Sequence, residues 1–161
     1  MRHTISVLVT NEFGVLSRIS GLFSGRGFNI ESLSVAETLD PKISRMTIVT
    51  SGDDKVLEQV NKQLNKLINV IKVHDFTDEE HIERELAMIK VTSNADTRAE
   101  ILSIVDIFRA KVVDVSPRTY TVEITGDEEK IGAITELFRP FGIKEIVRTG
   151  RIAMARSPKQ K

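Results

Sequence analysis

The sequence predicts an α+β protein that consists of two βαββαβ units in tandem. Three observations lead to this prediction. Several short segments alternate apolar and polar residues, as half-buried strands do. Between them lie segments whose apolar residues recur every three or four positions, as on one face of a helix. The same order of segments then occurs a second time in the second half of the 161-residue chain.

The first half supplies one complete unit. Alternation at Ile5, Val7 and Val9 is typical of the strands, and the helical spacing of Leu16 and Ile19 is typical of the helices. Glycine or Asp/Gly clusters separate the segments, as expected for turns. The predicted elements are, in order, a strand over 4–10, a helix over 14–25, strands over 30–37 and 43–50, a helix over 53–67 and a strand over 70–73.

The second half repeats this order. Asp127 follows Gly126 as Asp53 follows Gly52, in each case just before an apolar helix. We therefore predict two ferredoxin-like βαββαβ domains, over 1–76 and 83–161, joined by a linker over 77–82. The elements expected here are a strand over 85–92, a helix over 101–108, strands over 112–115 and 119–125, a helix over 131–138, a strand over 143–147 and a further strand over 152–155.

Composition excludes several classes of function. The chain has 23 basic and 23 acidic residues, so it lacks the excess of positive charge that is typical of nucleic-acid-binding proteins. It has no Cys, which excludes disulfides, thiol catalysis and thiolate metal sites and fits the cytoplasm. No apolar run reaches the roughly 20 residues that a membrane-spanning helix needs. We expect a cytoplasmic protein that binds neither membrane nor nucleic acid.

Catalytic and metal-binding motifs are not evident in the sequence. The three histidines lie in no recognisable nucleophile turn or metal spacing. His74 and His81 flank an acidic linker with Asp75 and Asp78, which could hold a metal, although a solvated linker is the commoner explanation of such a segment. We predict no catalytic residue, no metal and no cofactor in this chain.

The segment between the first strand and the second predicts a binding site for a small amino acid. A strand, a turn and a helix leave free backbone N–H groups at the helix start, where a carboxylate is favoured. Gly14 lets a ligand approach the backbone, and the amides of Asn11 and Asn29 offer both donors and acceptors. The alternative is that Asn11 is an N-cap and Gly14 a turn residue. The candidate effector-binding residues are Asn11, Gly14, Val15, Leu16, Asn29 and Ile30.

Several motifs resemble the regulatory small subunit of acetolactate (acetohydroxyacid) synthase, a family with an N-terminal ACT domain and a C-terminal ACT-like domain. They are NEFGVLSR at 11–18, RGFNIESL at 26–33, IFRA at 107–110 and RTG at 148–150. The resemblance covers nearly the whole chain. Phe13 departs from it, since the family commonly has a small residue or proline at this turn position.

The resemblance implies a non-catalytic role. The small subunit binds and activates a large catalytic subunit, and valine, an end product of branched-chain amino acid biosynthesis, binds between the ACT domains of two chains and restores low activity. Thiamine diphosphate, Mg and FAD are implied only for the catalytic partner. Asn11, Gly14 and Asn29 match positions associated with valine sensitivity, and Val15, Leu16 and Ile30 match the surrounding pocket.

Two other functions stay open at this point. The chain would also fit an amino-acid-sensing double-ACT regulator of a different enzyme. An RNA-binding module is the other alternative, because βαββαβ sheets can stack bases on exposed aromatic side chains.

Each sheet is expected to have helices on one face only, and the first unit has more apolar strand residues than one face readily buries. We therefore expect a homodimer that associates through the ACT domains.

Overall fold

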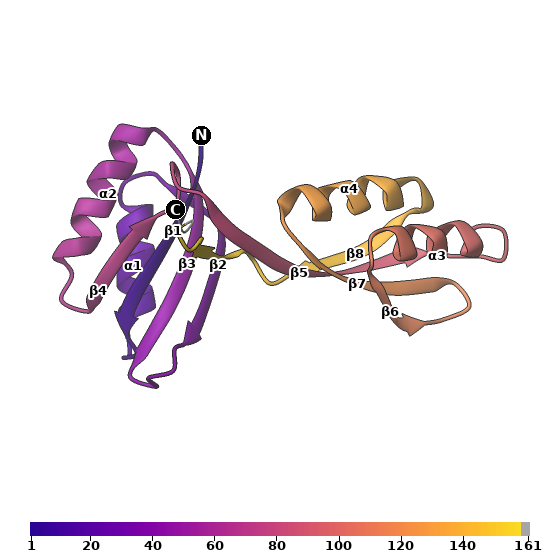
Figure 1. Cartoon of the computed structure of the whole chain (residues 1–161), viewed down its shortest axis with the longest axis horizontal. Helices are drawn as coiled ribbons and strands as arrows, with labels where there is room; N and C mark the ends of the chain where they lie inside the picture. The colour runs from indigo at the N-terminus through magenta and orange to yellow at the C-terminus, as the bar shows by residue number, and fades with distance from the viewer. Residues whose placement is uncertain (159–161) are drawn as a thin grey trace. The chain divides into compact units, whose positions relative to one another are not determined.

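A computed structural model describes residues 1–158 and shows the expected order of elements twice (Figure 1). The chain divides into two compact units. The first contains Met1–Ile82 together with the described residues from Arg151 onward, and the second contains Glu83–Gly150. Each unit has the βαββαβ order, so the predicted α+β fold class is confirmed.

The first unit is a four-stranded antiparallel sheet in the order β2-β3-β1-β4. The register pairs Ile5 with Ile48 and Val7 with Met46, which places these four side chains on one face. Apolar residues of both helices pack against that face in a single core. The elements are β1 (Arg2–Thr10), α1 (Val15–Ser24), β2 (Asn29–Glu37), β3 (Ile43–Ser51), α2 (Asp54–Lys66) and β4 (Val70–Asp75).

The second unit has a sheet in the order β6-β7-β5-β8, and β9 pairs with β5. Its core joins alternate residues of β5 and β7 to the apolar faces of two helices. β5 begins within the expected linker over 77–82. The elements are β5 (His81–Thr92), α3 (Arg98–Ile107), β6 (Lys111–Val115), β7 (Thr119–Gly126), α4 (Glu128–Phe138), the 3-10 helix η1 (Arg139–Phe141) and β8 (Ile143–Arg148). The last strand, β9 (Ile152–Ala155), lies among the residues that group with the first unit.

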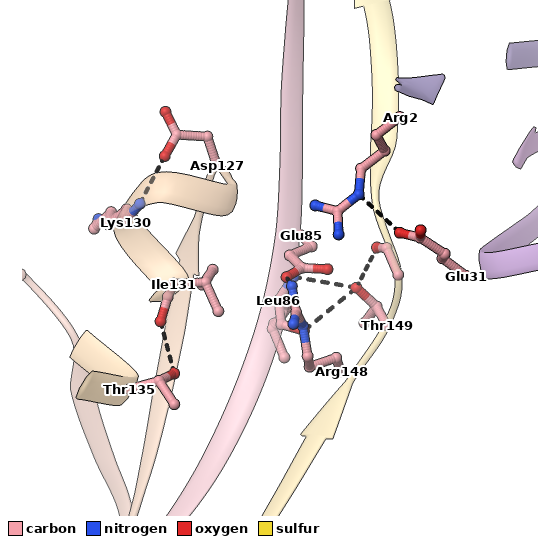
Figure 2. A network of polar contacts seen from close by, with 11 residues as sticks. Arg2, Glu31, Glu85, Leu86, Asp127, Lys130, Ile131, Thr135, Arg148 and Thr149 are labelled. Atoms are coloured by element: carbon pink, nitrogen blue, oxygen red, sulfur yellow. Dashed lines mark hydrogen bonds and ion pairs between the residues drawn. The ribbon is translucent and has the colours of Figure 1, made fainter. Parts of the chain in front are cut away.

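The helices begin in two different ways. The side chain of Asp53 accepts a hydrogen bond from the backbone N–H of Lys55 and so caps α2. Asp127 caps α4 in the same way through the N–H of Lys130, as Figure 2 shows. In contrast, α1 begins after Gly14, and no side chain caps it. Its first N–H groups therefore stay available for another partner.

The face of the first sheet opposite the helices is largely polar and is nevertheless buried in part. Thr4, Ser6 and Thr47 lie on the face opposite the helices and are nevertheless buried. A guanidinium nitrogen of Arg151 lies 3.5 Å from the hydroxyl oxygen of Thr4, so the chain's own tail contributes to this cover. The sequence predicts residues 151–161 as part of the second domain, whereas the described residues of this tail, 151–158, group with the first. Lys159 and Lys161 of the tail lie outside the described residues.

The apolar strand residues of the first unit also differ from expectation. Val7, Val9, Met46 and Ile48 are all buried in the one core beneath the helices. The register places all four on the same side, so one face does bury them. Val35, the fifth apolar residue of that expectation, is 44% exposed on β2, so the expected excess is limited to this residue. The remaining structural reason to expect association is the free edge of β2, which pairs only with β3.

Replacing Gly52 by Ala should destabilise the first unit by about 1–3 kcal/mol. A Cβ at this position would overlap the ring of Phe28, which is buried and packs edge-on against Phe23 and so cannot easily move. Urea unfolding measures the change. The matched control is Gly132→Ala in α4, where a Cβ meets no atom within 4 Å. That variant should be stabilised by about 0.5–1 kcal/mol, because Ala restricts the unfolded chain more than Gly.

Candidate functional site

The turn between β1 and α1, residues 11–14, forms one half of the candidate site; we refer to it as loop 11–14. Gly14 has φ +79°, a left-handed conformation that favours glycine, and a Cβ there would meet no atom within 4 Å. The space above the helix start is therefore open. Because the first turn of α1 contains no acidic residue and no side-chain cap, its N–H groups present uncompensated partial positive charge.

Asn11 does not cap the helix, so this part of the alternative is wrong, whereas Gly14 is a turn residue as the alternative states. Its Nδ2 donates hydrogen bonds to the carbonyl oxygen of Pro41 (3.0 Å) and to Oε1 of Glu37 (3.3 Å), and its backbone N–H donates to the carbonyl oxygen of Lys42 (2.8 Å). These contacts fasten loop 11–14 to the turn that connects β2 and β3. Within the described residues its Oδ1 accepts no hydrogen bond, which leaves an exposed acceptor beside the helix start.

The apolar residues of this half-site have different environments. Val15 is only 4% exposed and belongs to the core, so its side chain is not available to a ligand. Leu16 is 45% exposed and remains accessible. Phe13 is fully exposed, and its ring therefore does not fill the open space at Gly14 from within the chain.

Asn29 and Ile30 lie at the other end of the same sheet. Asn29 pairs with Ser51, whereas Glu37, at the opposite end of β2, pairs with Ser44 beside Asn11. Eight residues of strand separate the two ends, which is about 26 Å. A ligand of amino-acid size cannot touch Asn11 and Asn29 of one chain. The six candidate residues therefore form two separate half-sites in each chain.

The second half-site is at the start of an unpaired strand edge. Asn29 is exposed, and its side-chain amide makes no hydrogen bond within the described residues. Its backbone carbonyl oxygen accepts a hydrogen bond from the hydroxyl of Thr50. Ile30 is half-buried and packs against the core. Since β2 has a neighbouring strand on one side only within residues 1–158, its other edge can pair with another strand.

Asn69, in the turn between α2 and β4, is a residue that sequence analysis missed. Its side chain contacts Thr10, Glu12 and Arg18, which lie before, within and just after loop 11–14. An Asn shortly after a helix normally indicates a turn, so the pattern gave no signal for this contact. Only the fold brings residues 51 or more positions apart to one place.

Two family models match the chain, one to each half. Residues 5–72 match the ACT domain described as that of small subunits of AHAS (acetohydroxyacid synthase), and residues 84–157 match the small subunit of acetolactate synthase. A protein named acetolactate synthase small subunit from Aquifex aeolicus is 60% identical over 156 residues, which are 96% of this chain and 81% of that protein.

The chain belongs to the acetolactate synthase small-subunit family.

Other members of the family are similar to this chain along nearly its whole length. A probable acetolactate synthase small subunit from Archaeoglobus fulgidus is 55% identical over 160 residues, covering 99% of this chain and 100% of that one. The crystal structure of the small subunit from Thermotoga maritima aligns with a TM-score of 0.88 at 42% identity, over 98% of this chain and 99% of that chain. Family members are named as subunits of a biosynthetic enzyme, which implies a catalytic large subunit as partner.

No metal site or membrane helix emerges from the described residues of this small-subunit family member. Over residues 1–158, no three His, Cys, Asp or Glu side chains are placed so that they could hold a metal ion. In the linker, Nε2 of His74 lies 2.6 Å from Oε2 of Glu79, and the rings of His74 and His81 both stack on Phe76. None of the helices in the same part of the chain is long and apolar enough to cross a membrane.

An ion pair lies next to the second half-site. Nε of Arg2 lies 2.7 Å from Oε2 of Glu31, as Figure 2 shows, and the hydroxyl of Ser51 donates to Oε1 of the same carboxylate. The hydrogen bond from Ser51 is the main reason that the pKa of Glu31 lies below its ordinary value of 4.5; partial burial opposes it and the charge of Arg2 reinforces it.

Acid should therefore weaken the first unit through Glu31. A carboxyl whose pKa is lower in the folded state stabilises the fold above the unfolded pKa, and this contribution is lost as the pH falls through the folded pKa. Glu31→Gln should lose less stability than the parent between about pH 7 and pH 3. The difference should be about 0.5 kcal/mol or less, because the pair is partly exposed. Urea unfolding at both pH values measures it, and equal losses in the two proteins would contradict the assignment.

Proposed function

We propose that this chain is the regulatory subunit of acetolactate synthase and confers valine feedback inhibition. It binds and activates a thiamine diphosphate-dependent catalytic subunit in branched-chain amino acid biosynthesis. Valine binds the ACT domain and reverses the activation. Thiamine diphosphate, Mg and FAD act in the catalytic subunit, and this chain contributes no catalytic residue. Family membership and the arrangement of the two half-sites support the proposal.

The single observation that carries the proposal is the placement of Asn29 relative to Asn11. β2 runs from Asn29 to Glu37, with Leu33 at its centre. If two β2 edges pair antiparallel about a two-fold axis at Leu33, Asn29 of one copy lies opposite Glu37 of the other. Glu37 in turn contacts Asn11 of its own chain. Dimerisation through this edge would therefore unite the two half-sites and generate two equivalent sites.

The united site has the right chemistry for a branched-chain amino acid. The free N–H groups at the start of α1 suit the ligand's carboxylate. The available Oδ1 of Asn11 suits its ammonium group, and the amide of Asn29 from the second copy can serve either end. The exposed side chain of Leu16 and the partly buried Ile30 of the second copy offer an apolar surface for the aliphatic group.

Feedback inhibition then requires a difference between two states of the dimer. Valine shifts the equilibrium only if it binds one arrangement of the paired ACT domains better than the other. A coupling free energy of about 1–3 kcal/mol between the valine site and the catalytic subunit is typical of such regulation. The coupling is reciprocal, so the catalytic subunit must weaken or strengthen valine binding by the same factor.

The strand surfaces favour this function over RNA binding. In residues 1–158 the only Phe, Tyr or Trp on a strand is Tyr120, and it is 6% exposed within the core of the second unit. RNA-binding sheets of this fold stack bases on exposed aromatic side chains of their strands. An aromatic platform of that kind is not present on the described strands.

The test is a calorimetric titration of valine, leucine and isoleucine into the purified chain, with and without the acetolactate synthase catalytic subunit. We expect valine to bind one site per chain in a dimer and to reduce the activity of the reconstituted complex to that of the catalytic subunit alone. No binding of any branched-chain amino acid would contradict the effector site. Binding without any effect on acetolactate synthase would favour a regulator of a different enzyme.

A further inference from the structure

We propose that Asn69 is the residue that positions loop 11–14, and that it does so by acting as hydrogen-bond donor and acceptor at once. Its Oδ1 accepts from Nη1 of Arg18 at 2.8 Å. Its Nδ2 donates to the hydroxyl oxygen of Thr10 and to Oε2 of Glu12, each at 2.9 Å. With 8% exposure, the residue is buried, and both polar atoms of its side chain are used.

These contacts hold the loop from both sides. Thr10 ends β1, Glu12 lies in the loop, and Arg18 is in the first turn of α1. The backbone N–H of Thr10 also donates to the carbonyl oxygen of Asn69 at 2.9 Å. One side chain from the α2–β4 turn thus fixes the positions at which the loop leaves the sheet and enters the helix.

Besides the hydrogen bonds of Asn11 to Glu37 and to the β2–β3 turn, little else holds the loop, so its ends need the contacts of Asn69. Gly14 has more conformational freedom than any other residue type, and no atom lies where its Cβ would be. Phe13 is fully exposed and adds no packing. Polar contacts must therefore supply the order. A loop that is ordered before the ligand arrives spares the complex the entropy cost of ordering it during binding.

The part of this inference that concerns valine affinity rests on the proposed function, but the ordering of the loop does not. The N–H of Glu12 donates to the carbonyl oxygen of Thr10, and the N–H of Arg18 donates to that of Gly14. Hydrogen exchange of these two amides reports the order of the loop in the absence of any ligand. The two claims can therefore fail separately.

The first experiment compares Asn69→Ala with Asn65→Ala in the full-length chain. Asn69→Ala should increase amide exchange at Glu12 and Arg18 at least tenfold and weaken valine binding about tenfold, while the chain stays dimeric and folded. Asn65 is the matched control, because its Nδ2 donates only to the carbonyl oxygen of Asn61 within α2, away from the loop. Unchanged exchange in Asn69→Ala would overturn the proposal even if valine binds.

The second experiment exchanges donor and acceptor. Asn69→Asp removes the donor and places a carboxylate against that of Glu12, so exchange should rise and valine affinity should fall. Adding Glu12→Gln supplies a donor from the other side, and the double variant should recover both quantities to within about threefold of the parent. A residue that acts only through general stability would not be rescued in this way. Failure of the double variant to recover loop protection would contradict the proposed role.

If the parent chain binds no valine, the proposed function fails. Amide exchange alone then shows whether Asn69 positions loop 11–14. If valine binds but Asn69→Ala and its parent have the same affinity and the same exchange, the effector site stands and the positioning role is wrong.

Discussion

Replacing Gly14 by Asp should abolish valine inhibition and leave activation of the catalytic subunit intact. The new carboxylate would lie at the start of α1, where the free N–H groups would otherwise donate hydrogen bonds to the carboxylate of valine. Because no atom lies within 4 Å of the Cβ position, the side chain has room in the free chain. The left-handed φ of +79° strains any side chain, but Asp and Asn tolerate it better than most residues.

Steady-state activity of the reconstituted complex measures both effects. We expect full activation and no inhibition at valine concentrations about a hundredfold above the midpoint of the parent. Gly14→Asn is the matched control, since it has nearly the same shape and the same tolerance of the left-handed region but no charge. It should retain more inhibition than Gly14→Asp. Retained inhibition in Gly14→Asp itself would refute the placement of the carboxylate site.

Asn29→Ala should weaken valine binding by about tenfold to a hundredfold, because a polar end of the ligand would be left unpaired. The fold should be unaffected, since the Asn29 side chain makes no hydrogen bond within the described part of its own chain. Calorimetry gives the affinity, and urea unfolding serves as the control. A loss of affinity together with a loss of stability would indicate a structural role, and an unchanged affinity would exclude Asn29 from the site.

The order of the strands and helices could be predicted from the sequence, because alternating strands, helical spacing and Asp/Gly turns each mark an element within a few residues. The beginnings of α2 and α4 at Asp53 and Asp127 are examples. The tail after Arg151 was assigned to the wrong neighbour, since no local pattern states which sheet face a terminal segment will cover.

The residues of the candidate site could be proposed from the sequence, but their arrangement in space could not. Loop 11–14 and Asn29 could be identified from residue types alone, yet only the register shows that they lie at opposite ends of the sheet. The core position of Val15 depends on the rotation of α1, and the contact of Asn69 with Glu12 depends on chain segments far apart in sequence. Such long-range relations are set by tertiary packing and have no local signature.

The central claim is that each valine site takes loop 11–14 from one chain and Asn29 from another. The most direct test is a mixed dimer of one Gly14→Asp chain and one Asn29→Ala chain, purified with two different affinity tags. Each variant homodimer has two defective sites. In the mixed dimer, Gly14 of the second chain meets Asn29 of the first, so calorimetry should find valine binding with parental affinity at one of the two sites. A mixed dimer that binds no better than either variant homodimer would contradict the two-chain site.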